Sequence, residues 1–82
     1  MTDTGFLPDQ TIDITRDVCP MTFVRTRLAL DRLPPGAVLE VRLRGEEPRR
    51  NVPRSAIEHG HAVLAQEDLA EDVTRLLIRK QA

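Results

Sequence analysis

The sequence predicts a two-layer α/β (α+β) sandwich whose elements follow the order β-α-β-α-β-β. Three observations support this prediction: β-branched or alternating segments, two helical segments bounded by proline or glycine, and a final pair of strands separated by a short turn. Because each helix can join parallel strands through a right-handed crossover, both helices should cover one face of a four-stranded mixed sheet. The other face should be exposed to solvent or used in assembly.

The first half of the chain predicts a strand, a helix and a second strand. Residues 11–15 are β-branched and alternating, as in a strand. The helix should run from Pro20 to about Leu33, because Pro34-Pro35-Gly36 stops it. Residues 37–43 form the clearest strand, since their side chains alternate between two faces. The inward set is Leu39, Val41 and Leu43, and the outward set is Glu40, Arg42 and Arg44.

The second half predicts a helix followed by two strands. Glu46 and Glu47 favour a helix start at the positive end of the dipole, while a start at Pro53 is the alternative. His59-Gly60 should end this helix. An acidic turn, 67–72, then joins the two strands into a hairpin. The strands are 61–66 and 73–80; Leu76 and Ile78 share a face, and Thr74 and Leu77 interrupt the alternation.

Size and composition limit the kind of protein this can be. The 82 residues make one domain at most, which we place at 11–82 after a flexible tail at 1–10. The net charge is −1, and there is no tryptophan or tyrosine, so we expect neither membrane nor stable nucleic-acid binding. The tail lacks the apolar run of a signal peptide, and one cysteine forms no internal disulfide. Both features favour the reducing cytoplasm.

Cys19, the only cysteine, stands directly before the predicted helix start at Pro20. Free N–H groups and the helix dipole at such a position favour negative charge on sulfur, so the thiol should ionise easily. A lone cysteine is otherwise most often a small buried apolar residue. A thioredoxin-like fold also uses Cys-Pro at a helix start, but this chain is short for it and has no second cysteine.

The predicted first helix carries two apolar stripes. One contains Phe23, Leu30 and Leu33, with Thr26 between them, and the other contains Met21, Val24 and Leu28. One stripe suffices to cover a sheet. The second is expected to pack on the neighbouring helix, with exposure to a partner as the alternative. Arg25 and Arg32 should face water.

Several of these residues resemble the pattern of the TusA (SirA-like) sulfur-carrier family. The family's mark is Cys-Pro-x-Pro at the start of the first helix, and Cys19-Pro20-Met21-Thr22 matches it except at the fourth position. Further similarity lies in Pro35-Gly36, Glu47-Pro48, Asn51-Val52-Pro53 and the terminal strand, so it covers roughly residues 11–80. Besides Thr22, Arg16 departs from the pattern, because a glycine often stands there.

The resemblance implies a persulfide relay. Cys19 would accept sulfane sulfur from a donor such as a cysteine desulfurase and pass it to an acceptor protein, as in tRNA thiolation or related sulfur trafficking. Such a protein is a sulfurtransferase that acts more as a carrier than as a turnover enzyme, and it needs no cofactor. Pro20 would pre-form the helix start. Asp13, Arg16 and Thr22 would flank the site, and Thr22 could hydrogen-bond nearby backbone.

Partner docking is expected at Met21, Val24, Arg25, Leu28, Arg49 and Arg50. The last two belong to a basic cluster in the sequence, which is a solvated surface, a patch for an acidic partner or an RNA contact. The cluster is Arg42, Arg44, Arg49, Arg50 and Arg54. The main rival to a carrier is a non-catalytic adaptor of the same fold that binds through the second stripe.

His59-Gly60-His61 could suggest a metal site. We expect no metal, because no second thiol or cluster of acids lies nearby in the sequence. His59 should instead cap the end of the second helix, where a cation is favoured.

Overall fold

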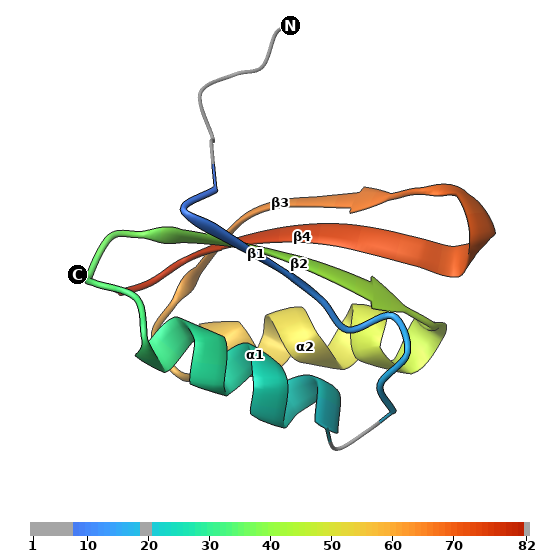
Figure 1. Ribbon diagram of the computed structural model, residues 1–82, viewed down its shortest axis with the longest axis horizontal. Helices are drawn as coiled ribbons and strands as arrows, with labels where there is room; N and C mark the ends of the chain where they lie inside the picture. Colours follow the sequence, from blue (N-terminus) through green and yellow to red (C-terminus); the bar gives the residue numbers. More distant parts are fainter. Residues whose placement is uncertain (1–7, 19–20, 82) are drawn as a thin grey trace, which may run out of the picture.

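The computed structural model describes residues 8–18 and 21–81, and its elements follow the predicted order (Figure 1). They are β1 (Gln10–Asp13), α1 (Met21–Asp31), β2 (Val38–Arg44), α2 (Glu46–Glu58), β3 (Ala62–Asp68), the short 3₁₀ turn η1 (Ala70–Asp72) and β4 (Val73–Arg79). No helix in these ranges is long and apolar enough to cross a membrane.

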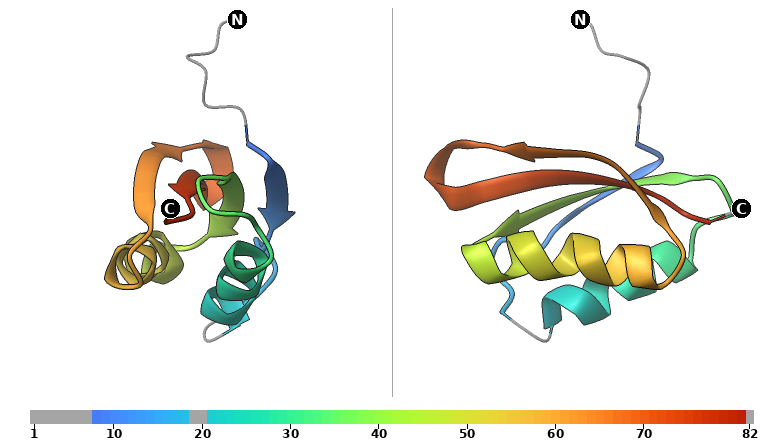
Figure 2. Two further views of the ribbon diagram at one scale, coloured as in Figure 1. Left: turned by 90° about the vertical axis from the view of Figure 1, so that its left-hand side faces the viewer. Right: turned by 180° about the vertical axis from the view of Figure 1, so that it is seen from behind.

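The four strands form one mixed sheet in the order β1-β2-β4-β3. β1 pairs with β2 in parallel, and β4 runs antiparallel to both β2 and β3, with a register shift between Val63 and Ala65. Both helices lie on one face of the sheet, as Figures 1 and 2 show from three directions. The predicted two-layer architecture is therefore confirmed.

The core lies between the sheet and the two helices. Strand alternation points Leu39, Val41 and Leu43 of β2 toward the helices, and none of the three is exposed at all. Other elements complete the cluster with Ile14, Ala29, Leu30, Val52, Ala56, Leu76 and Ile78. Thr74 shares this face, so it continues the alternation of β4 that we expected it to interrupt.

α2 begins at Glu46 and continues through Pro53, so the alternative start at Pro53 is wrong. A proline inside a helix leaves the carbonyl four residues earlier without its usual donor. Here that carbonyl belongs to Arg49, and it accepts a hydrogen bond from Gln66 Nε2 of β3 at 3.1 Å. Gly60 follows the helix with φ +91°, as the predicted glycine stop requires.

The end of α1 is fixed by a side chain from the other end of the chain. Lys80 Nζ donates to the carbonyl of Leu30 at 2.8 Å. A cation at a helix C-terminus satisfies a carbonyl that has no donor within the helix and interacts favourably with the dipole. This contact holds the last turn of α1 against the strand layer.

The expectation that the second stripe of α1 packs on the neighbouring helix is wrong. Phe23, Thr26 and Leu30 turn toward α2 and line a pocket with it. Met21, Val24 and Leu28 are 45%, 42% and 51% exposed. Because the first set already fills the contact with α2, the second set remains on the surface. Arg25 and Arg32 are exposed, as predicted.

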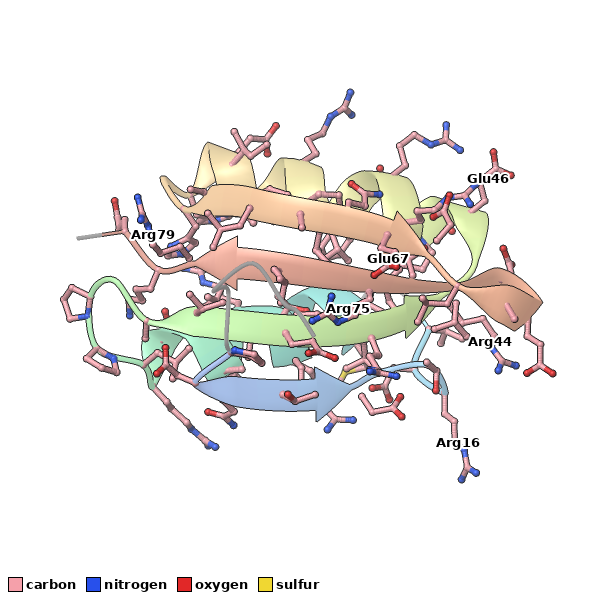
Figure 3. The ribbon with its side chains drawn as sticks, turned by 90° about the horizontal axis from the view of Figure 1, so that it is seen from above. Arg16, Arg44, Glu46, Glu67, Arg75 and Arg79 are labelled. Atoms are coloured by element: carbon pink, nitrogen blue, oxygen red, sulfur yellow. The ribbon has the colours of Figure 1, made fainter. Side chains whose placement is uncertain are left out.

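The sheet face away from the helices is charged (Figure 3). Glu40 points to this face as predicted, but only 5% of it is exposed. Arg42 Nε approaches Glu40 Oε2 at 2.8 Å, and Arg75 Nε approaches Glu40 Oε1 at 3.3 Å. Arg75 also reaches Glu67 of β3 at 3.5 Å. One arginine of the same strand and one of the neighbouring strand thus let a carboxylate be buried outside the core.

Candidate functional site

The candidate site is the turn that joins β1 to α1. Cys19 and Pro20, the expected persulfide residue and helix start, lie outside the described residues. On their two sides, the Met21 N–H donates a hydrogen bond to the Val18 carbonyl at 2.7 Å. α1 begins at Met21 and has no acidic residue in its first turn. The described backbone therefore brings the two flanks of Cys19-Pro20 together at a helix N-terminus, where negative charge is favoured.

Asp13, at the end of β1, organises the start of this turn. Its Oδ1 accepts hydrogen bonds from the Thr15 N–H at 2.9 Å and from Thr15 Oγ1 at 2.7 Å. The backbone bond, followed by the hydroxyl bond, lowers the pKa of the Asp13 carboxyl below its usual value. Asp13 therefore forms an Asx-turn, in which its side chain accepts from the backbone N–H two residues further along the chain. Arg16 is exposed and points away from the sheet (Figure 3).

Thr22 takes the place of the second motif proline, and none of its surface is exposed. Its carbonyl accepts a hydrogen bond from Thr26 Oγ1 at 2.8 Å, one turn further along the helix. The side chain at this motif position is therefore part of the packing beneath α1. A docked partner would meet Met21 before it could meet Thr22.

Asp17 is a member of the site that the sequence analysis missed. Arg25 Nη1 lies 2.7 Å from Asp17 Oδ2, and both side chains are partly exposed. Exposed pairs of this kind contribute less than about 1 kcal/mol, yet this one links the turn to the second turn of α1. The separation of eight residues gives no sequence signal, because it fits no pairing rule within a single helix.

Exposed apolar side chains continue from the turn along α1. We call them the apolar strip: Val18, Met21, Val24 and Leu28, which are 74%, 45%, 42% and 51% exposed. This strip is a candidate docking surface, because contiguous exposed apolar patches are enriched at binding surfaces. The predicted docking residues did not include Val18. Its position directly before Cys19 in the sequence could have identified it as one.

The predicted basic cluster is divided between the two faces of the protein. Arg42 and Arg44 of β2 lie on the face away from the helices, whereas Arg49, Arg50 and Arg54 belong to α2. Two of the helical arginines are paired: Arg49 with Asp68 at 3.7 Å and Arg50 with Glu46 at 3.5 Å. The expectation of one local cluster is therefore wrong, since α2 and the outer face of β2 lie on opposite sides of the sheet.

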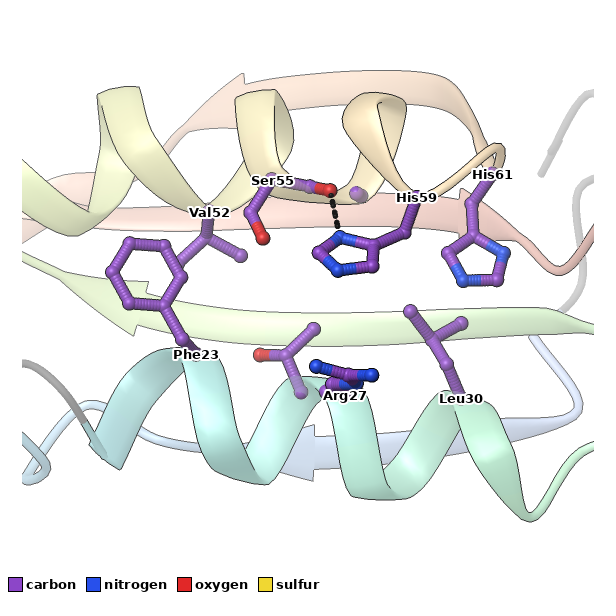
Figure 4. A pocket seen from close by; sticks show the side chains of 9 residues that line it. Phe23, Arg27, Leu30, Val52, Ser55, His59 and His61 are labelled. Atoms are coloured by element: carbon purple, nitrogen blue, oxygen red, sulfur yellow. Dashed lines mark hydrogen bonds between the residues drawn. The ribbon is translucent and has the colours of Figure 1, made fainter.

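The two histidines bind backbone groups at the end of α2. His59 Nδ1 donates to the carbonyl of Ser55 at 2.8 Å, which is a capping contact (Figure 4). His61 Nδ1 accepts from the Gln81 N–H at 3.1 Å. Burial, and after it the charges of Lys80 and His59, lower the pKa of His61, against a smaller opposite effect of Asp31. The described residues contain no group of three potential metal ligands.

We expect stability to fall in mild acid because of His61. Its pKa in the folded state lies below the ordinary 6.5. In the unfolded chain His61 has its ordinary pKa of 6.5, so below pH 6.5 the unfolded chain binds a proton before the folded protein does. The stability that His61 contributes above pH 6.5 is therefore lost as the pH falls toward the lowered pKa of the folded state. Urea unfolding between about pH 8 and about pH 5 should show this decline, and a smaller one in His61→Gln. An equal or steeper decline in the variant would contradict the prediction.

Comparison with known proteins finds one family that this chain and its fold match. The family model described as "Sulfurtransferase TusA" matches residues 10–80. A protein of Archaeoglobus fulgidus named "Putative sulfur carrier protein" is 38% identical over 73 residues, which cover 89% of this chain and 83% of that protein. Escherichia coli YedF, also named "Putative sulfur carrier protein", is 34% identical, with 93% of this chain and 97% of YedF covered.

A solved structure supports the same assignment. The crystal structure of a SirA-like protein from Desulfitobacterium hafniense superposes with a TM-score of 0.78 at 26% identity, covering 89% of this chain and 99% of that one. Fold, motif and length of match agree. The chain belongs to the TusA (SirA-like) family.

Proposed function

We propose that this protein is a sulfur carrier that accepts sulfane sulfur as a persulfide on Cys19 and relays it to an acceptor protein. The observation that carries the proposal is the start of α1 at Met21, directly after Cys19-Pro20, with no acid in its first turn. The nearest acid in the sequence, Asp17, is paired with Arg25. The helix N-terminus favours a thiolate or persulfide anion there, and nearby carboxylates repel it little.

The transfer step is a thiol exchange that needs no cofactor. The Cys19 thiolate attacks the outer sulfur of a donor persulfide, such as that of a cysteine desulfurase. The S–S bond of the donor breaks, its cysteine leaves as a thiolate, and a new S–S bond forms on Cys19. The second transfer repeats this step on an acceptor cysteine. Atoms and electrons balance without an external oxidant.

The apolar strip serves as the docking surface for donor and acceptor in turn. It begins at Val18 and Met21, on the two sides of Cys19-Pro20, so a partner bound there would lie beside the thiol. We propose Arg25, Arg49 and Arg50 as further docking residues; in the free protein each forms an ion pair, with Asp17, Asp68 and Glu46 respectively. We place this relay in the cytoplasm, in sulfur trafficking of the kind that supplies tRNA thiolation.

Sulfur loading tests the proposal directly. The protein is incubated with a cysteine desulfurase and cysteine, and its intact mass is then measured. We expect a gain of one sulfur atom that a reducing thiol removes and that Cys19→Ser does not show. No gain with several different donors, or a gain that persists in Cys19→Ser, would contradict a carrier.

The exposed apolar strip also favours a second function, that of a non-catalytic adaptor. An adaptor would bind its partner through Val24 and its neighbours without using the thiol. The two functions differ in one variant: Cys19→Ser should leave an adaptor's partner binding and cellular role intact, whereas it should abolish the role of a carrier.

A further inference from the structure

A groove lies between β1 and α1. It is on the side of α1 opposite Phe23, Thr26 and Leu30, the residues that face α2. Its cavity volume is about 330 Å³, which is room for several side chains of a bound molecule. The groove is lined by Gln10 and Ile12 of β1 and by Arg25, Leu28, Ala29 and Arg32 of α1.

The groove is apolar in its middle and positively charged along α1. Ile12 is half-buried, and Leu28 is 51% exposed. Arg25 and Arg32 flank Leu28 in the helix and are about 10 Å apart along its axis. Arg25 is paired with Asp17 at the surface, whereas Arg32 forms no ion pair with any residue that the structure describes.

The acids at the two ends of β1 have partners of their own. Asp9 Oδ2 accepts a hydrogen bond from the Val38 N–H at 2.7 Å, and Asp13 Oδ1 accepts from Thr15. Among the described residues, no acidic side chain lines the groove. The groove therefore favours a partner that brings negative charge.

β1 is an outermost strand of the sheet. It pairs with β2 and with no other described strand, so its second edge presents backbone N–H and C=O groups that another strand can bind. β3 is the outermost strand on the other side, but its register shift and its acidic end at Glu67 and Asp68 discourage the addition of an acidic strand. The left view of Figure 2 also shows α2 directly beneath β3. β1 is therefore the edge that can accept such a strand.

We propose that an extended acidic segment of another protein adds to the free edge of β1 as a fifth strand and places alternate side chains in the groove. Side chains at i, i+2 and i+4 of a strand share one face and span about 13 Å. An acid at i and another at i+4 would pair with Arg25 and Arg32, and an apolar residue at i+2 would pack on Leu28. A second copy of this chain is disfavoured at the groove, because it would bring like charges together.

The groove continues the proposed docking surface. Leu28 is the last residue of the apolar strip and also lines the groove, so a protein bound along the strip could extend a segment to β1. That this protein is a sulfur donor or acceptor rests on the proposed function. The binding of an acidic strand does not, because it involves no sulfur chemistry.

Titration of the full chain with a blocked peptide, followed by ¹H–¹⁵N NMR, tests this proposal. The probe is acetyl-Ser-Glu-Thr-Leu-Thr-Glu-Ser-amide, in which the two acids and the leucine alternate with β-forming threonines. We expect shifts and slower hydrogen exchange of the β1 amides, residues 10–13, together with shifts of Leu28 and Arg32. The same peptide with glutamine in place of both glutamates should bind about fivefold more weakly, because two ion pairs are lost.

Two variants of the protein locate the site. Arg32→Gln removes an exposed charge of the groove and should weaken binding of the acidic peptide about threefold. Arg54→Gln makes the same change on α2, outside the groove, and should leave the affinity within about 1.5-fold.

The proposal is overturned if no β1 amide shifts at peptide concentrations up to about 5 mM, or if shifts occur in α1 without β1. Equal binding of the glutamine peptide, or normal binding by Arg32→Gln, would overturn it as well. Since neither peptide carries sulfur, these outcomes are independent of whether Cys19 can be loaded.

Discussion

Replacing Val24 with aspartate is expected to slow sulfur transfer from the donor to Cys19 by about tenfold or more. Val24 lies in the middle of the apolar strip and is 42% exposed. A carboxylate there must lose its water when a partner docks, and the apolar contact is lost as well. The free energy of unfolding should change by less than about 0.5 kcal/mol, because the side chain has no place in the core. Single-turnover loading followed by intact mass gives the rate.

Two control variants and one control measurement separate docking from chemistry. Val24→Ser removes apolar area without adding charge, so it should slow loading less than Val24→Asp does. The rate of Cys19 alkylation in Val24→Asp shows whether the thiol itself has changed. Ile57→Asp places the same charge on α2, at a residue that is 59% exposed, and should load normally. Normal loading of Val24→Asp would exclude the apolar strip as the docking surface.

Leu43→Ala is expected to lower the free energy of unfolding by about 3 kcal/mol. The leucine is fully buried on the helix-facing side of β2, where it is paired with the buried Thr74 of β4. Removing the side chain loses apolar burial and leaves a cavity that a small domain closes only in part. Because total stability of a domain of this size is about 5–10 kcal/mol, the loss is a large fraction.

Urea unfolding measures this loss, with Ile57→Ala as the matched control. That residue is 59% exposed, so its truncation should change stability by less than about 0.5 kcal/mol. A difference between the two variants below about 1 kcal/mol would show that the interior of β2 is not the centre of the core.

The element order was predictable because local patterns determine it. The alternation in β2 and the Pro34-Pro35-Gly36 boundary of α1 act within a few residues. The structure confirms both, although α1 ends at Asp31 and not at the predicted Leu33. α2 was ambiguous for a physical reason. Pro53 removes the donor that the Arg49 carbonyl would have within the helix, and the donor that replaces it is Gln66 of β3, which is distant in sequence.

The candidate site was predictable in part. The motif at Cys19-Pro20 identified the turn, but the Asp17–Arg25 pair and the burial of Thr22 depend on how the chain folds back. The second stripe of α1 shows the same limit. Helical periodicity identifies an apolar face, but only the position of α2 decides whether that face is covered.

The order β1-β2-β4-β3 has a consequence for the time course of synthesis. β4 is the last of the four described strands along the sequence, yet within this sheet it lies between β2 and β3 and pairs with both. A chain that has emerged from the ribosome only as far as residue 72 has β1 and β2, which pair with each other, but lacks the strand that connects β3 to them. Long-range pairing of this kind is slow to form. Cys19 is therefore synthesised well before the four-stranded sheet can be completed, which happens only after β4 has emerged.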